Sequence, residues 1–220
     1  MKNSDIKQLV IVCRDYNLNW EQFINPIFIG VETGVLSLLK YKKPIKFICC
    51  DNDTINKQQL KILNDQSKIH NFEIITFNKE KDFIDSELAI VTAISKKINF
   101  QQIVIVSDGI RWDMLLASIN IIKKYECFNP ILLGENNYCF LLKAKSEYIF
   151  YNWQLTYKYI SFFSLDNEEV IYNFSGCKFY PNQDITVTNN STQTISNEFN
   201  KKERPKLIIK KGKCLVFLHK

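Results

Sequence analysis

Residues 103–124, IVIVSDGIRWDMLLASINIIKK, join an apolar β-branched run to a longer amphipathic run through a short polar turn. Residues 103–107 predict a buried strand, and residues 112–124 have the length and spacing of a helix. The same alternation repeats from the start of the chain to about residue 135. This pattern is typical of strand–helix–strand units that build a mostly parallel sheet.

The first part of the chain contains ten such runs. Strands are predicted at residues 9–13, 27–31, 45–50, 72–77, 103–107 and 131–133, and helices at residues 34–41, 56–68, 86–98 and 112–124. In the third helix, Leu88, Val91, Ile94 and Ile98 recur at helical intervals, which indicates one buried stripe.

The sequence pattern changes from about residue 145, where short strand-like runs alternate with Asn, Asp, Gly and Pro. Strands are predicted at residues 148–151, 157–164, 169–172, 185–188, 206–209 and 214–218, with turns at residues 173–176, 189–193 and 210–212. We therefore expect an α/β fold. A mostly parallel sheet with flanking helices would occupy residues 1–140, and a small all-β sandwich would occupy residues 145–220.

Composition limits the class of protein. The 220 residues are 46% hydrophobic and 24% charged, which argues against a disordered, collagenous or coiled-coil chain. The net charge of +6 favours anionic ligands only weakly. Of the 29 basic residues, three are arginines: Arg14, Arg111 and Arg204.

The seven cysteines show no C-x-x-C spacing and several lie in apolar runs, so we expect free thiols and a cytoplasmic location. No apolar run approaches the ~20 residues of a membrane helix, and we expect neither export nor membrane insertion. With His70 and His219 as the histidines, we set aside a Ser-His-Asp triad and a multi-histidine zinc site. The common glycine-rich phosphate-binding motifs are absent from the sequence.

Carboxylates stand where predicted strands end. Asp51 and Asp53 follow the strand at 45–50, and ligands of open α/β sheets bind at the carboxyl ends of strands. Alternate residues of an extended segment point the same way, so the two could share one hard cation. The competing interpretation is a turn in which Asp53 or Thr54 caps the next helix.

Two further clusters allow the same pair of interpretations. Asp82 and Asp85 precede the helix at 86–98, where acidic residues also serve as helix caps. Arg111 suits bidentate binding of phosphate oxygens, and an ordinary surface pair with Asp113 is the alternative.

These clusters resemble the motifs of thiamine pyrophosphokinase (thiamine diphosphokinase). The family's G-D-x-D-S corresponds to CDNDT at 50–54, its K-D-x-T-D-x-E-x-A to KDFIDSELA at 81–89, and its G-G-R-x-D-H to GIRWDM at 109–114, followed by LAS at 116–118. The upstream A-D-G-G-A resembles VETGV at 31–35. In the C-terminal half, GCKF at 176–179 resembles G-L-K-[YW], and SNE at 196–198 matches S-N-E. The departures from the family pattern are Cys50, Ile84, Ile110 and Met114.

The resemblance implies an ATP-binding catalytic domain over residues 1–140 and a thiamine-binding β-sandwich over residues 145–220, in a homodimer that binds thiamine where the subunits meet. It implies transfer of diphosphate from ATP to the hydroxyethyl group of thiamine, with AMP as the second product. Neither nucleic acid nor a membrane is an expected partner.

Site residues follow from the same resemblance. Asp51, Asp53 and Asp85 would hold Mg²⁺, one of them accepting the hydroxyl proton. Arg111 would bind phosphate, and Asp113 would orient Arg111 or a nucleotide hydroxyl. The residues implied for ATP are Glu32, Gly34, Asp51, Lys81, Arg111, Asp113 and Ser118. For thiamine they are Phe179, whose ring face suits a cation, and Thr194, Ser196 and Asn197, which would bind the pyrimidine.

Alternatives remain at this point. Phe179 could be an ordinary core aromatic of a β-sandwich. The changes at Ile84 and Met114 favour considering another small alcohol as acceptor on the same scaffold. A non-enzymatic protein that binds nucleotide or nucleic acid is the third interpretation.

Overall fold

A computed structural model describes residues 5–51, 57–77, 82–107, 111–200 and 202–220. The chain divides into two compact units, Met1–Glu135 and Asn136–Lys220. The second unit begins before the 140–145 interval expected to separate the domains, because residues 137–143 form a strand of that unit. Among the described residues, no helix is both long and apolar enough to cross a membrane.

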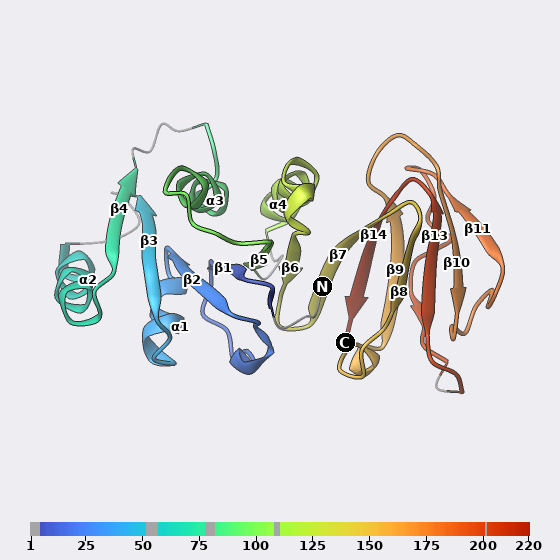
Figure 1. The fold of residues 1–220 in the computed structure, drawn as a ribbon, viewed down its shortest axis with the longest axis horizontal. Coiled ribbons are helices and arrows are strands. Elements are labelled where there is room, and N and C mark those ends of the chain that lie inside the picture. Colours follow the sequence, from blue (N-terminus) through green and yellow to red (C-terminus); the bar gives the residue numbers. More distant parts are fainter. Residues whose placement is uncertain (1–4, 52–56, 78–81, 108–110, 201) are drawn as a thin grey trace. The chain divides into compact units, whose positions relative to one another are not determined.

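The first unit is built on a parallel sheet (Figure 1). Its strands lie side by side in the order β6-β5-β1-β2-β3-β4, and every neighbouring pair is parallel. The strands are β1 (Gln8–Val12), β2 (Pro26–Val31), β3 (Ile45–Asp51), β4 (Glu73–Phe77), β5 (Gln102–Val106) and β6 (Ile131–Leu133). The mostly parallel sheet predicted from the sequence is confirmed.

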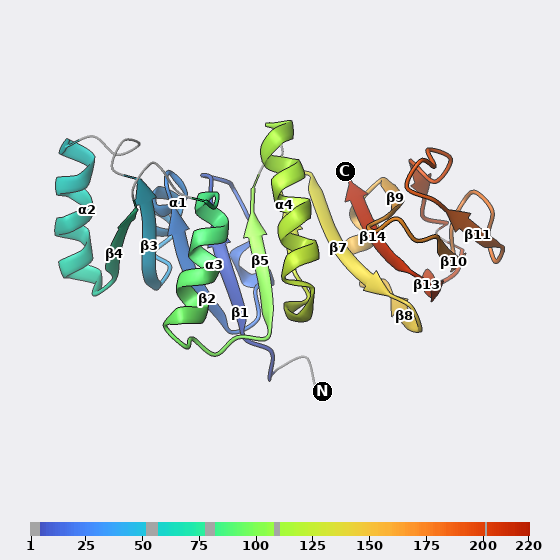
Figure 2. The ribbon, with the colours of Figure 1, turned by 90° about the horizontal axis from the view of Figure 1, so that it is seen from above.

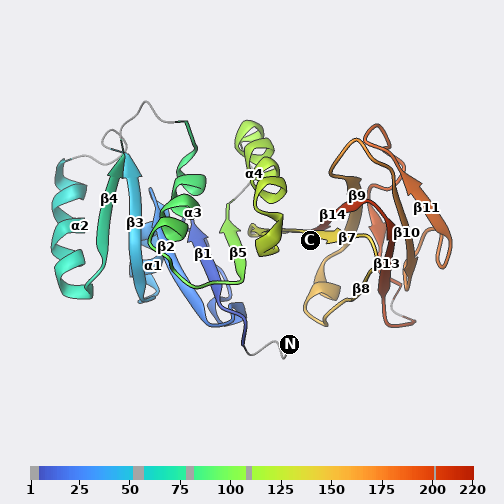
Figure 3. The same cartoon turned by 45° about the horizontal axis from the view of Figure 1, so that its top comes forward.

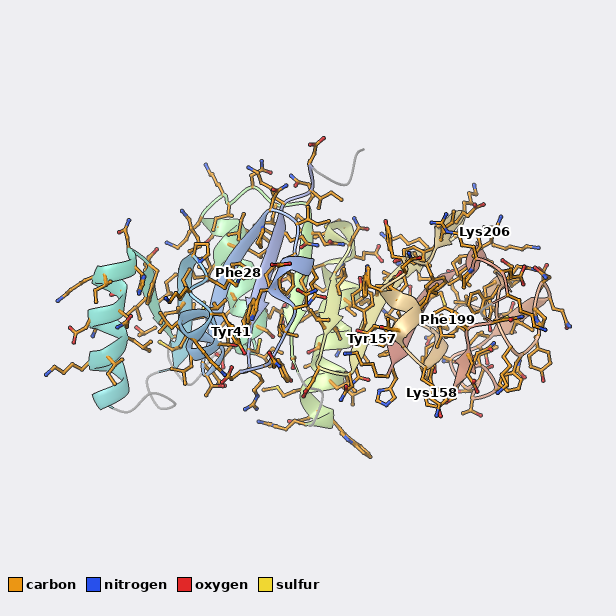
Figure 4. The ribbon with its side chains drawn as sticks, turned by 90° about the horizontal axis from the view of Figure 1, so that it is seen from below. Phe28, Tyr41, Tyr157, Lys158, Phe199 and Lys206 are labelled. Atoms are coloured by element: carbon orange, nitrogen blue, oxygen red, sulfur yellow. The ribbon has the colours of Figure 1, made fainter. Side chains whose placement is uncertain are left out.

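Four helices accompany this sheet: α1 (Gly34–Lys40), α2 (Lys57–His70), α3 (Asp85–Ser95) and α4 (Trp112–Lys124). Figures 2 and 4 show α3 and α4 on one face of the sheet and α1 on the other. On the α1 face, Trp20 packs against Phe28 and Tyr41, with ring centroids 5.8 and 5.3 Å apart. Short 3₁₀ helices cover Trp20–Gln22 and Glu126–Phe128.

Burial on both faces explains why the strands read as continuous apolar runs. Every residue of β1 is buried, and Leu9, Ile11, Ile103 and Ile105 of the two central strands have no exposed surface. Helix-covered parallel strands require such side chains on both faces of the sheet. The core of this unit therefore lies along β1 and β5.

The order of the strands reverses between β1 and β5. The chain runs from β1 outward through β2, β3 and β4, then returns to the other side of β1 for β5 and β6. The backbone N–H of Cys13 donates to the carbonyl of Val106 at 3.0 Å, so the two strand ends stay joined. In open α/β sheets such a reversal opens a crevice at the carboxyl ends of the strands, which is where ligands bind.

The second unit consists of two four-stranded antiparallel sheets (Figure 3). One has the order β12-β9-β14-β7 and the other β11-β10-β13-β8. The strands are β7 (Asn137–Lys143), β8 (Ser146–Ile149), β9 (Tyr159–Ser164), β10 (Val170–Ser175), β11 (Asp184–Val187), β12 (Asn197–Glu198), β13 (Lys206–Lys211) and β14 (Lys213–His219), with a 3₁₀ helix at Gln154–Thr156. Phe162 of the first sheet contacts Tyr172 and Phe174 of the second, with ring centroids 4.4 and 5.5 Å apart. The expected all-β C-terminal region is confirmed.

Three local predictions were wrong at their edges. The turn expected at 173–176 is largely strand, because β10 continues to Ser175, and Gly176 turns the chain with φ +71°. Likewise β13 continues to Lys211, and Gly212 turns with φ +77°. The helix expected to reach residue 98 ends at Ser95, because Lys97 adopts φ +54° and the N–H of Ile98 bonds back to Ala93 at 3.0 Å.

Candidate active site

A small cavity lies at the reversal point of the parallel sheet, and we call it the switch-point cavity. It has a volume of about 60 Å³. Since one water needs roughly 10–15 Å³, the cavity holds a group the size of a phosphoryl group and not a whole nucleotide. Its lining comes from the ends of β1, β2 and β5 and the starts of α3 and α4: Cys13, Arg14, Val31, Glu32, Ile84, Asp85, Ser86, Ile105, Ser107, Arg111, Met114 and Ser118.

Glu32 stands directly after β2 in a conformation that non-glycine residues rarely adopt. Its φ is +47°, and its backbone N–H donates to the carbonyl of Cys49 at 3.2 Å. Such a backbone costs on the order of 1 kcal/mol or more and persists where the surroundings fix it, often at functional sites. The Glu32 carboxylate is close enough to raise the pKa values of both Cys13 and Arg111.

Asp85 is the first residue of α3 and lies half-buried in the cavity wall. The N-cap position belongs to Ile84, which offers no side-chain hydrogen bond. Asp85 therefore does not cap its helix, contrary to the capping interpretation, although its charge still suits the helix N-terminus. Asp82 is exposed and is not part of the cavity lining.

Cys13 follows β1 and lines the same cavity. Burial, together with the negative charge of Glu32 and Asp85, raises the pKa of its thiol from 9.0 to about 12. The thiol is therefore neutral at physiological pH and lacks the thiolate character of a nucleophile.

Arg111 stands at the N-cap of α4 and is bound by Asp113. Its Nε donates to Oδ1 of Asp113 at 3.2 Å, and its Nη2 donates to Oδ2 at 2.5 Å. This hydrogen bonding raises the pKa of Arg111 and lowers that of Asp113. The expected pairing of the two residues is present, and Arg111 lines the cavity whereas Asp113 is an exposed residue beside it.

Met114 and Ser118 complete the α4 side of the cavity, one helical turn apart. The Ser118 hydroxyl donates to the backbone carbonyl of Met114 at 2.8 Å. The hydroxyl proton is thus used within the helix, and the Ser118 oxygen can act toward a ligand as a hydrogen-bond acceptor.

Gly34, expected at the ATP site, begins α1. A Cβ at this position would overlap the backbone carbonyl of Val12. Glycine here lets α1 approach the end of β1, and the residue is not part of the cavity lining.

Other predicted residues lie at the same sheet edge or outside the described residues. Asp51 is the last residue of β3, whose carboxyl end lies on the same edge as those of β1 and β5, and nothing is described of its side chain. Asp53 and Lys81 fall outside the described residues. Within the described part of the chain, no three His, Cys, Asp or Glu side chains are grouped to hold a metal ion.

A second, larger cavity lies in the β unit, and we call it the Phe179 cavity. It has a volume of about 360 Å³, within the size range of small-molecule sites. It is lined by Tyr172, Phe179, Tyr180, Ile185, Gln193, Thr194, Ile195 and Asn197. Phe179 is 47% exposed, so it is not an ordinary core aromatic.

Asn197 holds the backbone of Phe179 from both sides. Its Oδ1 accepts the Phe179 N–H at 3.1 Å, and its Nδ2 donates to the Phe179 carbonyl at 3.0 Å. The same Oδ1 accepts the N–H of Glu198 at 2.9 Å. Asn197 is 8% exposed, and its amide group is largely used in these hydrogen bonds. Its contribution to the cavity is therefore to fix the backbone at Phe179.

Thr194 and Ser196 flank the same wall. The Thr194 hydroxyl donates to the carbonyl of Phe162 at 2.7 Å and is buried. Ser196 has φ +61°, and its N–H is held by Ser161 Oγ at 2.9 Å. Thr194 lines the cavity, and Ser196 lies next to it in sequence without being part of the lining.

Sequence reasoning missed several lining residues. Cys13 and Arg14 could have been found by the strand-end rule that selected Asp51, because Cys13 is the last residue of the first predicted strand and Arg14 follows it. Tyr172 and Ile185 carried no such signal, since they meet only through the pairing of β10 with β11, where they are register partners.

Several solved structures of similar fold are described as thiamine pyrophosphokinases. The structure is similar to thiamine pyrophosphokinase from Bacillus subtilis (TM-score 0.77, 22% identity, covering 97% of this chain and 98% of that one). It is also similar to the enzymes from Geobacillus thermodenitrificans (0.76, 19%, 98% and 97%) and Candida albicans (0.72, 14%, 99% and 90%). No protein-family model and no curated protein matches the chain. The chain therefore has the fold of the thiamine pyrophosphokinases.

Proposed function

We propose that the chain is a divergent thiamine pyrophosphokinase, an enzyme that transfers diphosphate from ATP to thiamine and releases AMP. The observation that carries the proposal is the switch-point cavity, where Arg111, Asp85 and Glu32 converge although they come from three separate motifs. The likeness of fold to thiamine pyrophosphokinases over nearly the whole chain supports it.

In this proposal the switch-point cavity receives the phosphates of ATP. Arg111 offers a planar fork of N–H donors that matches phosphate oxygens, and Asp113 fixes the direction of that fork. Asp85 and Glu32 supply carboxylate oxygens, the donors that Mg²⁺ prefers, and Asp51 and Asp53 are the proposed further ligands. Bound Mg²⁺ would neutralise charge on the polyphosphate.

The reaction needs no covalent intermediate. The thiamine hydroxyl oxygen forms a bond to the β-phosphorus of ATP, the bond from that phosphorus to the α–β bridging oxygen breaks, and AMP leaves. The hydroxyl proton passes to a carboxylate, for which Asp85 is our candidate. Rate enhancement then comes from in-line positioning and from neutralising the phosphates, which suits a site that offers a neutral thiol and no histidine among its lining residues.

The Phe179 cavity is the proposed thiamine site. The Phe179 ring already lies 5.1 Å from the ammonium of Lys178, so its face is suited to a cationic ring such as thiazolium. Tyr172 and Tyr180 add aromatic surface, and the volume matches a small heteroaromatic molecule. We further propose a cytoplasmic homodimer in which thiamine binds where the subunits meet, and light scattering of the purified protein tests the dimer.

The test is AMP release from ATP and Mg²⁺ with and without thiamine. We expect thiamine-dependent AMP and thiamine diphosphate, identified by mass. If ADP is formed in place of AMP, the enzyme transfers a single phosphoryl group and the proposed diphosphate transfer is wrong. Predominant oligonucleotide binding with a steep salt dependence, and no AMP, would favour the binding-protein interpretation.

A second candidate acceptor follows from one observation. Ile84 and Met114, which replace the family's Thr and His, both line the switch-point cavity. They therefore change the wall next to the reacting groups. A thermal-shift panel of thiamine, its analogues and other small alcohols distinguishes the two candidates, because a ligand stabilises the fold according to its affinity.

A further inference from the structure

We propose that Arg14 is a second phosphate-binding residue. Together with Arg111 it binds the phosphates beyond the α-phosphate, and the protein thereby distinguishes ATP from AMP. The proposal rests on the proposed function, since it assigns the polyphosphate to the switch-point cavity. Arg14 belongs to none of the motifs that resemble the thiamine pyrophosphokinase pattern.

The first support is the position of the two arginines in the sheet. Arg14 follows β1 and Arg111 follows β5, and these strands are parallel neighbours with Val12 and Val106 in register. Both residues therefore leave the sheet at its carboxyl edge on either side of the reversal point, and both line the same cavity. A ligand in the cavity therefore lies beside an arginine from each of the two strand ends.

The second support is how sparingly arginine is used. Of 29 basic residues, 26 are lysines and three are arginines. Two of those three arginines, Arg14 and Arg111, are the cationic residues among those that line the cavity. Arginine differs from lysine in presenting five N–H donors in a rigid plane, which suits the oxygens of one phosphoryl group or of two adjacent groups.

The third support is the balance of charge. The two arginines line the cavity together with Glu32 and Asp85. A cavity with both signs suits a ligand with both signs, namely a polyphosphate that carries a divalent cation. The cavity volume of about 60 Å³ accommodates phosphoryl oxygens, so the adenosine must lie outside it.

The experiment measures nucleotide affinity by calorimetry for the full-length wild type and for Arg14→Gln. We expect Arg14→Gln to weaken ATP binding by about tenfold or more, because it removes charge-assisted hydrogen bonds to the phosphates. Its affinity for AMP should change by less than about twofold. The matched control is Arg204→Gln, which removes the same charge from an exposed residue of the β unit and should leave both affinities unchanged.

A conservative variant separates phosphate binding from general electrostatics. Arg14→Lys keeps the charge and loses the planar fork, so its ATP affinity should fall between those of wild type and Arg14→Gln. It also serves as the test if Arg14→Gln does not fold. Equal loss for ATP and AMP, equal loss in Arg204→Gln, or unchanged ATP affinity in Arg14→Gln and Arg14→Lys would overturn the proposal.

Failure of the proposed function has a different signature. If wild type binds no ATP, the assignment of the cavity to polyphosphate is wrong, and Arg14 falls with it. If wild type binds ATP and Arg14→Gln binds it equally well, the proposed function stands and only the role of Arg14 is rejected.

Discussion

Arg111 and Asp113 bind each other through two hydrogen bonds, Nε to Oδ1 at 3.2 Å and Nη2 to Oδ2 at 2.5 Å, at the start of α4. The two donors occupy one edge of the guanidinium, and its other N–H groups point away from Asp113. Because both side chains are exposed, the pair adds little to the stability of the fold. The contribution of the pair is to fix the orientation of the Arg111 guanidinium beside the switch-point cavity.

The pair should be visible in a pH titration of Asp113. Hydrogen bonding to Arg111 lowers the pKa of Asp113 below its ordinary value of 3.8, so the ionised pair persists above that range and is lost as the pH falls through the lowered pKa. NMR of the Asp113 carboxyl carbon should give a midpoint below 3.8. In Arg111→Gln the midpoint should rise toward the ordinary value, and an unchanged midpoint would contradict the pairing.

Asp85→Asn should lower kcat by about 100-fold or more, because it removes a proposed metal ligand and proton acceptor. The melting temperature should change little, since asparagine keeps the size and shape of the side chain and the N-cap position belongs to Ile84. Asp82→Asn is the matched control, because it removes the same charge from an exposed residue just before α3. Steady-state kinetics on both variants decide the matter. Retention of most activity in Asp85→Asn would reject its assigned role.

Asn197→Ala should act on both stability and thiamine binding. It removes the hydrogen bonds that Asn197 makes to the N–H and carbonyl of Phe179 and leaves the carbonyl with the Cys177 thiol at 3.3 Å, at a cost of about 1–3 kcal/mol in the free energy of unfolding. KM for thiamine should rise more than KM for ATP, because the backbone that positions Phe179 is held less firmly. Denaturant unfolding and kinetics check this, with Asn189→Ala, a change at an exposed turn, as the control. Equal increases in both KM values would contradict it.

Gly34→Ala should destabilise the first unit severely. The added Cβ would overlap the carbonyl of Val12, which forces α1 away from β1 and costs about 3 kcal/mol or more. Thermal unfolding measures the loss. Thr33→Ala at the preceding, exposed position makes a comparable change and should have little effect, because the Thr33 side chain makes no capping hydrogen bond. Full stability in Gly34→Ala would show that the packing is not tight.

Cys13 should resist alkylation at pH 8. With a pKa raised to about 12, its thiol stays protonated until the pH approaches that value, and only the thiolate reacts. The exposed Cys127 should be modified first by iodoacetamide in the native protein. Peptide mass mapping over a pH series reads both sites. Modification of Cys13 ahead of Cys127 would contradict the burial of its thiol.

The fold was predictable where one signal decides the structure. The parallel strands are buried on both faces, so β1 and β5 read as unbroken apolar runs. Strand β7 was missed although residues 138–142, YCFLL, form a continuous apolar run of strand length, which is a signal that the sequence does carry. The end of α3 depends on the left-handed conformation of Lys97, which no residue type there announces.

The residues of the candidate site also fall into those that local sequence identifies and those that depend on strand pairing. Arg111, Asp85 and Glu32 were found because each stands at a strand end or helix start inside a recognisable motif. Arg14 stands at a strand end outside any motif, and its role depends on which strands become neighbours. The meeting of Tyr172 and Ile185 in the Phe179 cavity depends likewise on the pairing of β10 and β11, which local sequence does not specify.

The most direct test of the account identifies the products of one reaction mixture. ATP, Mg²⁺ and thiamine are incubated with wild type, with Asp85→Asn and with Asp82→Asn, and the masses of the nucleotide and thiamine products are measured. We predict AMP and thiamine carrying two added phosphoryl groups for wild type and Asp82→Asn, and neither product at a comparable rate for Asp85→Asn. Thiamine left unmodified by wild type while ATP is bound or hydrolysed would contradict the central claim.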